Sequence, residues 1–122
     1  MANIRLGSVS LDCADPTALA AFWAGLLDGE IAFASEEFVA VKLPSMWITA
    51  VKVERYVPPT WPADDVAKQF HLDLAVDDLD AAVAQAVALG ATRPESQTAP
   101  ERFVVLLDPA GHPFCLTTMI PD

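Results

Sequence analysis

The stretch that decides the fold is FHLDLAVDDLDAAVAQAVALGA, residues 70–91, because it describes a strand followed by a helix. In its first part every second residue is a large apolar one, and this period of two indicates a half-buried strand. The apolar positions are Phe70, Leu72, Leu74 and Val76, and the positions between them are His71, Asp73 and Ala75. Asp78 is a suitable N-cap for the helix, and Gly90 suits the left-handed position just past its end. The expected apolar stripe of this helix is Leu79, Ala82, Val83, Ala86 and Leu89.

The same pattern occurs earlier, in SVSLDCADPTALAAFWAGLLDGEIA, residues 8–32. With Ser8 placed opposite His71, the alternating strand residues of the two segments coincide, and Asp15 aligns with Asp78. Asp15 followed by Pro16 predicts an N-cap and a proline at the first helical position. The expected stripe of the first helix is Leu19, Phe22, Trp23 and Leu26, and Gly29 is expected to end it. The chain therefore contains an internal repeat of a strand–helix unit.

Short strands are predicted after each helix. They cover about 30–35, 37–43 and 46–54 in the first repeat, and about 92–97, 102–107 and 113–119 in the second. DPAG, residues 108–111, predicts the turn that joins the last two strands. The expected fold is a single α+β domain, residues 1–122, of tandem βαβββ modules at about 1–55 and 69–122. A proline-rich linker at 56–68 joins them, and each sheet is expected to carry its helix on one face and to curve as a cup on the other.

Composition limits the classes of partner. The chain has 122 residues, of which 53 % are hydrophobic, and a net charge of −10. This charge repels phosphate backbones, so binding of nucleic acid or of anionic membranes is not expected. It favours a cationic or neutral ligand, with solubility alone as the simpler explanation. The start of the sequence has no signal-peptide pattern, and Cys13 and Cys115 lack zinc-type spacing, so reduced thiols and a cytoplasmic location are expected.

Three motifs in order, on a duplicated βαβββ pattern, carry a family resemblance. They are the stretch at 70–91, RFVVLLDPAGHPFCL at 102–116 and YVPPTWP at 56–62. Together they resemble the vicinal-oxygen-chelate superfamily, the glyoxalase/bleomycin-resistance/extradiol-dioxygenase group, and within it the small glyoxalase-like domain proteins. The resemblance implies two modules that each form half of a cup, a homodimer, and binding of small molecules in the cup.

Relatives often hold a divalent metal there, and the resemblance places the ligand positions of the family at Ser8, Val51, His71 and Cys115. Only His71 keeps a ligand type of the family. Valine offers no donor, and a serine hydroxyl is a weak neutral one, so loss of the metal site and no cofactor are expected. The alternative is a divalent metal at a substitute site, since Ser10, Asp12 and Asp73 share the face of His71 by strand parity.

The candidate ligand-binding residues are those expected to line the cup or its mouth. They are Ser8, Ser10, Trp47, Thr49, Val51, Trp61, His71, Asp73, Phe103 and Cys115. His71 has three interpretations: a metal ligand, a polar residue that hydrogen-bonds a ligand or Asp73, and a structural histidine. Trp23 is expected in the core, and no catalytic residue is identified.

Three functions remain open at this point. The first is a metal-independent protein that binds a small aromatic or cationic compound. The second is a lyase, isomerase or dioxygenase with a non-standard metal site, in which His71, Asp73 and Cys115 take part. The third is an interaction module whose cup is filled by its own side chains.

Overall fold

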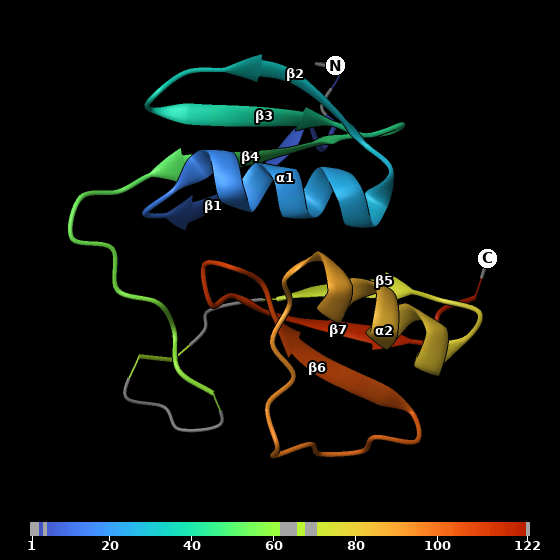
Figure 1. The fold of residues 1–122 in the computed structure, drawn as a ribbon. Helices are drawn as coiled ribbons and strands as arrows, with labels where there is room; N and C mark the ends of the chain where they lie inside the picture. The colour runs from blue at the N-terminus through green and yellow to red at the C-terminus, as the bar shows by residue number, and fades with distance from the viewer. Residues whose placement is uncertain (1–2, 4, 62–65, 68–70, 122) are drawn as a thin grey trace. The chain divides into compact units, whose positions relative to one another are not determined.

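The computed structural model describes residues 3, 5–61, 66–67 and 71–121. This part of the chain divides into two compact units, residues 1–56 and 57–122 (Figure 1). The division falls at Tyr56, the residue at which the proline-rich linker is predicted to begin. The predicted strand residue Phe70 and the linker positions 62–65 and 68 lie outside the described residues.

The first unit has the predicted βαβββ order. Its elements are β1 (Ser8–Cys13), α1 (Pro16–Leu27), β2 (Glu30–Ala34), β3 (Phe38–Lys42) and β4 (Trp47–Lys52). The sheet order is β1-β4-β3-β2, in which β1 pairs in parallel with β4 and the other pairs are antiparallel. The strands lie within two residues of their predicted bounds, because the period-two pattern and the turns between them agree with the final fold.

Helix α1 covers one face of this first sheet, mainly over β3 and β4. Asp15 caps it by accepting a hydrogen bond of 3.2 Å from the backbone N–H of Ala18. Leu19, Phe22 and Trp23 are buried at 1–2 % exposure, and the rings of Phe22 and Trp23 meet edge to face at 5.2 Å. Trp23 is thus a core residue, as predicted from the apolar stripe.

The end of α1 differs from the prediction. Asp28, not Gly29, adopts the left-handed conformation, with φ 53° and ψ 45°. Gly29 is required for another reason, because a Cβ there would lie 2.8 Å from Val41 Cγ1 and 3.1 Å from the carbonyl oxygen of Lys42. The glycine permits close approach of the chain to β3, whereas Gly90 does end the second helix, with φ 120°.

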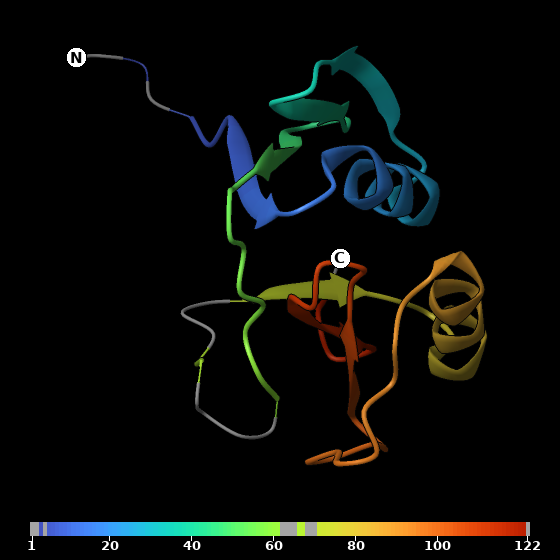
Figure 2. The same ribbon diagram turned by 60° about the vertical axis from the view of Figure 1, so that its left-hand side comes forward.

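The second unit has the order βαββ in the described residues, with one strand fewer than predicted. Its elements are β5 (Leu72–Ala75), α2 (Leu79–Leu89), β6 (Phe103–Leu107) and β7 (Pro113–Thr117). The sheet order is β5-β7-β6; β5 pairs in parallel with β7, and β6 is antiparallel to β7. Helix α2 lies on one face of this second sheet, against β6 and β7 (Figure 2). Asp78 caps α2 by accepting from the Ala81 N–H at 3.1 Å.

The predicted strand at 92–97 is wrong. Only Thr92 forms a bridge, with Leu107. Pro94 has no N–H to donate to a ladder, and the side chain of Gln97 takes over the pairing with β6. Its Oε1 accepts from the N–H of Val105, and its Nε2 donates to the oxygen of Val105, both at 2.9 Å.

The stripe of α2 is shorter than predicted, because Leu89 is 40 % exposed while Val83 and Ala86 are buried. The hairpin turn before β7 is confirmed. The buried carboxylate of Asp108 accepts hydrogen bonds from the N–H groups of Ala110 and His112, each at 2.9 Å, and Gly111 has φ 90°. None of the described helices combines the length and apolarity needed to span a bilayer.

Candidate functional site

The face of the second sheet that lies away from α2, called here the open face, carries the candidate site. On β7, Phe114 and Leu116 are buried at 0–1 % in the core. The alternation of a strand directs Cys115, the residue between them, to the opposite face. On β5, Leu72 and Leu74 alternate in the same way with Asp73. Strand parity thus places Asp73 and Cys115 on one surface.

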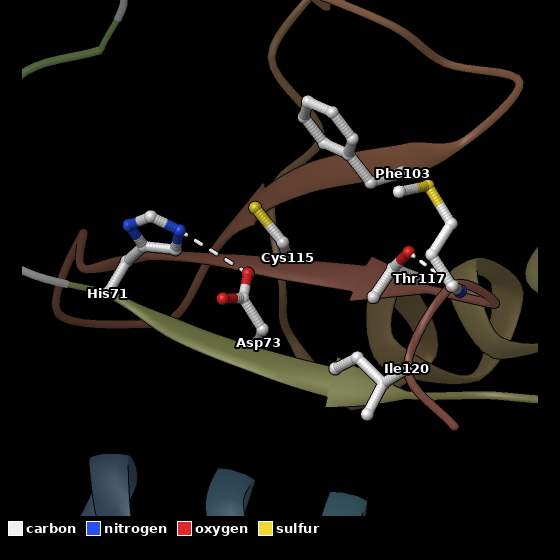
Figure 3. A pocket seen from close by; sticks show the side chains of 7 residues that line it. His71, Asp73, Phe103, Cys115, Thr117 and Ile120 are labelled. Carbon is white, nitrogen blue, oxygen red and sulfur yellow. Dashed lines mark hydrogen bonds and ion pairs between the residues drawn. The ribbon is translucent and has the colours of Figure 1, made fainter.

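Register then brings these two side chains side by side. Asp73 and Cys115 are direct partners in the parallel β5–β7 pair. His71, two residues before Asp73, has its Nε2 3.3 Å from Asp73 Oδ1. Potential ligand atoms of His71, Asp73 and Cys115 all lie within 4.8 Å of one another (Figure 3). The side chains of His71 and Asp73 are 36 % and 52 % exposed, whereas Cys115 is buried.

A pocket of about 350 Å³ opens over this cluster. It is lined by His71, Asp73, Phe103, Cys115, Thr117, Met119 and Ile120 (Figure 3). Thr117 Oγ1 donates to the carbonyl oxygen of Arg102 at 3.0 Å and accepts from the N–H of Met119 at 3.1 Å. These bonds fix the chain beyond β7, so that Met119 and Ile120 form an apolar side of the pocket. The pocket therefore joins a carboxylate, an imidazole and a thiol to an apolar wall.

A smaller pocket of about 200 Å³ shares part of this lining. Its walls are Trp61, His71, Thr98, Phe103, Val105, Pro113 and Cys115. Trp61 Nε1 donates to the carbonyl oxygen of Ser96 at 3.3 Å, which ties the proline-rich linker to the loop before β6. His71, Phe103 and Cys115 line both pockets, so the two spaces are adjacent.

The structure brings together half of the residues predicted to bind a ligand. Those found at the pockets of the second unit are Trp61, His71, Asp73, Phe103 and Cys115. The others, Ser8, Ser10, Trp47, Thr49 and Val51, lie on β1 and β4 of the first unit. They are on the face away from α1, since the alternating residues Ile48 and Ala50 are buried.

Other lining residues were not predicted. Thr117 could have been found from parity with Cys115, and Val105 from parity with Phe103, because each lies two residues along the same strand. Met119 and Ile120 follow the end of β7, where the period of two no longer applies. Their place depends on the hydrogen bond between Met119 N–H and Thr117.

The metal positions implied by the resemblance fall in both units, Ser8 and Val51 in the first and His71 and Cys115 in the second. The hydroxyls of Ser8 and Thr49 share a hydrogen bond of 2.9 Å, and Val51 has no donor atom. His71 and Cys115 occupy the other two positions. Asp73, which is not one of the four family positions, lies close to both of them. The alternative of a substitute site predicted a contribution from Ser10, Asp12 and Asp73; of these, Asp73 lies with His71 and Cys115 in a group of three side chains that could hold a metal ion.

Comparison with solved structures shows the same fold in several proteins of low identity. The fosfomycin resistance protein FosX from Mesorhizobium loti matches with a TM-score of 0.71 and 18 % identity, covering 95 % of this chain and 92 % of the other. FosX from Listeria monocytogenes, solved with Mn(II) and dihydroxypropylphosphonic acid, matches with a TM-score of 0.68 and 16 % identity over 97 % and 91 %. A glyoxalase/bleomycin resistance protein/dioxygenase family enzyme from Burkholderia phytofirmans gives 0.69 and 19 % over 93 % and 97 %.

No curated protein shows significant sequence similarity to the chain. The family of glyoxalase-like domains, in contrast, matches residues 8–117, which include every described helix and strand. The two N-capped strand–helix repeats agree with this match. So do the parallel strand pair in each sheet, β1–β4 and β5–β7, and the fold of the solved structures. The chain belongs to the glyoxalase-like domain family.

Proposed function

We propose that the protein binds a small aromatic or cationic compound in the larger pocket of the second unit. In this proposal the protein's own side chains hold the compound without a metal ion. The observation that carries this proposal is the lining itself. An exposed carboxylate, that of Asp73, faces a space of about 350 Å³ whose other walls include Phe103, Met119 and Ile120. Concave, largely apolar spaces with few polar groups are the usual form of small-molecule sites.

Charge supports a cationic ligand. The net charge of −10 attracts cations over the whole surface, and Asp73 supplies the charge inside the pocket. The half-buried ring of Phe103 adds a surface on which a flat cation can stack, and such contacts contribute about 0.5–1 kcal/mol at exposed sites. The flexible thioether of Met119 adapts to ligands of different shape.

The test compares two ligands that differ in charge, N-methylquinolinium and neutral quinoline, by isothermal titration calorimetry. Both should bind, the cation more tightly. Asp73→Asn should weaken the cation about 10-fold and leave quinoline unchanged. Asp12→Asn, at an exposed acid of β1, is the matched control and should change neither. Absence of heat for both compounds at millimolar concentration, or equal loss in the two variants, contradicts the proposal.

A second candidate function is metal-dependent chemistry of the lyase, isomerase or dioxygenase type. The approach of His71, Asp73 and Cys115 favours it. Elemental analysis of the purified protein tests it together with His71→Ala. A metal content under about a tenth of an equivalent per chain, unchanged by the substitution, rules this function out.

We further propose that the protein is a homodimer and that its partners are small molecules rather than nucleic acid or membranes. The acidic net charge supports the absence of nucleic-acid and membrane partners, because it repels phosphate groups. The exposed apolar side chains of the edge strand β2, Ile31 and Phe33, support a protein contact, since they are 45 % and 54 % exposed.

A further inference from the structure

The cluster of His71, Asp73 and Cys115 on the open face of the second sheet differs from an ordinary polar surface because it includes a thiol. The chain has two cysteines, and they face different environments. Cys13 of β1 is 1 % exposed, and its thiol donates to the carbonyl oxygen of Val51 at 3.4 Å. Cys115 directs its sulfur toward the pocket, beside His71 and Asp73 (Figure 3). A buried cysteine usually acts as a small hydrophobe, but an imidazole and a carboxylate at a thiol form a donor set for a metal.

The spacing of the three donors fits a tetrahedral ion. Zinc bonds to nitrogen, oxygen and sulfur are about 2.0–2.3 Å long, so ligand atoms on one ion lie roughly 3.3–3.8 Å apart. The donors here lie within 4.8 Å of one another, and Nε2 of His71 is already 3.3 Å from Asp73 Oδ1. Rotation of exposed side chains by about 1 Å closes the remainder, and the fourth position opens into the pocket.

From this geometry we infer that His71, Asp73 and Cys115 form a three-ligand site for a thiophilic divalent cation such as Zn²⁺, supplied by the second unit alone. Thiolate ligands select zinc over oxygen-preferring Mg²⁺ and Mn²⁺. Binding releases the thiol proton to solvent and leaves a thiolate and a carboxylate whose charges the cation neutralises. The ligand set therefore differs from the four positions that the family resemblance implies, two of which, Ser8 and Val51, belong to the first unit.

Cobalt is the probe for the sulfur ligand. Addition of one equivalent of Co²⁺ to the full chain should produce a thiolate-to-cobalt charge-transfer absorption in the near ultraviolet. The absorption should be lost in Cys115→Ser and retained in Cys13→Ser, which keeps a donor for Val51. An equal signal in Cys115→Ser, or no signal in the unchanged protein, overturns the inference.

Zinc calorimetry tests the other two ligands. His71→Ala and Asp73→Asn should each weaken Zn²⁺ binding by more than the roughly 10–100-fold that follows loss of a residue merely supporting a ligand. Glu36→Gln, at an exposed acid between β2 and β3, should leave the affinity unchanged, and Mn²⁺ should bind far more weakly than Zn²⁺. Zinc affinity that is the same in all three variants overturns the inference.

A measurement on the unchanged protein tests the inference even where the variants do not fold. Alkylation of the unchanged protein, followed by peptide mass spectrometry, should show Zn²⁺ protecting Cys115 but not Cys13; equal rates at Cys115 with and without zinc overturn the inference. None of these readouts needs an organic ligand. Zinc binding and quinolinium binding can therefore each fail while the other succeeds.

Discussion

Asp15 and Asp78 begin the helices of the two units in the same way. Both have extended backbones, with φ −125° and ψ 94° for Asp15 and φ −127° and ψ 107° for Asp78. Each carboxylate accepts from the N–H three residues on. A cap of this kind depends only on neighbouring residues, which is why the sequence pattern identifies it.

Asp78→Ala should lower the free energy of unfolding by about 1 kcal/mol, because the N–H of Ala81 loses its partner. Urea denaturation measures the change. Asp77→Ala is the control one residue earlier and should stay within about 0.5 kcal/mol. Equal effects of the two substitutions would show that Asp78 acts through its charge rather than as a cap.

Gly29→Ala should destabilise the protein by about 1–3 kcal/mol through crowding against β3. A Cβ at this position meets Val41 Cγ1 and Leu43 Cδ2 at 2.8 Å. Gly7→Ala is the control, since a Cβ there has nothing within 4 Å. Thermal unfolding of the two variants should separate them clearly, and a stable Gly29→Ala protein would contradict the close approach.

At the scale of elements, the segment at 92–97 shows how a side chain can replace a strand. Gln97 exchanges two hydrogen bonds with the backbone of Val105, as a strand partner would. The backbone N–H and oxygen of Val105 on β6 are thereby paired without a neighbouring strand. Strand propensity does not predict this conformation of the segment between α2 and β6.

Gln97→Ala should lower the free energy of unfolding by about 1–3 kcal/mol, because the N–H and oxygen of Val105 lose their side-chain partners. Gln85→Ala, on the exposed side of α2, is the matched control and should be nearly neutral. Chemical denaturation compares them. A neutral Gln97→Ala would mean that water replaces both bonds at no cost.

At the scale of the whole molecule, charge is the dominant property. A net charge of −10 on 122 residues acts over the Debye length, about 10 Å at 0.1 M salt and 3 Å at 1 M. If electrostatic attraction contributes to ligand binding, the affinity for N-methylquinolinium should fall as salt is raised between these values. Quinoline, which is neutral, should bind equally at both, and parallel weakening of the two would point to a general effect of salt.

Native mass spectrometry should give a species near 26 kDa, twice the chain mass of 13.1 kDa, if the protein is the expected homodimer. Phe33→Ser should shift it toward 13.1 kDa if the exposed apolar residues of β2 form the contact. Arg93→Ser, at an exposed loop position of the second unit, is the control. A monomer in the unchanged protein contradicts the expectation.

The sequence by itself determined the repeat, the N-caps of both helices, the strands of the first unit and the turn at Asp108, because each depends on contacts close in the chain or on period alone. Strand parity also placed Asp73 on the face of His71, and the family resemblance added Cys115 as a candidate of the same cup. Only the tertiary structure decided that Asp73 and Cys115 are direct partners, that Met119 and Ile120 wall the pocket and that Gln97 replaces a strand. These outcomes follow from register between β5 and β7 and from single long-range hydrogen bonds, which local patterns do not encode.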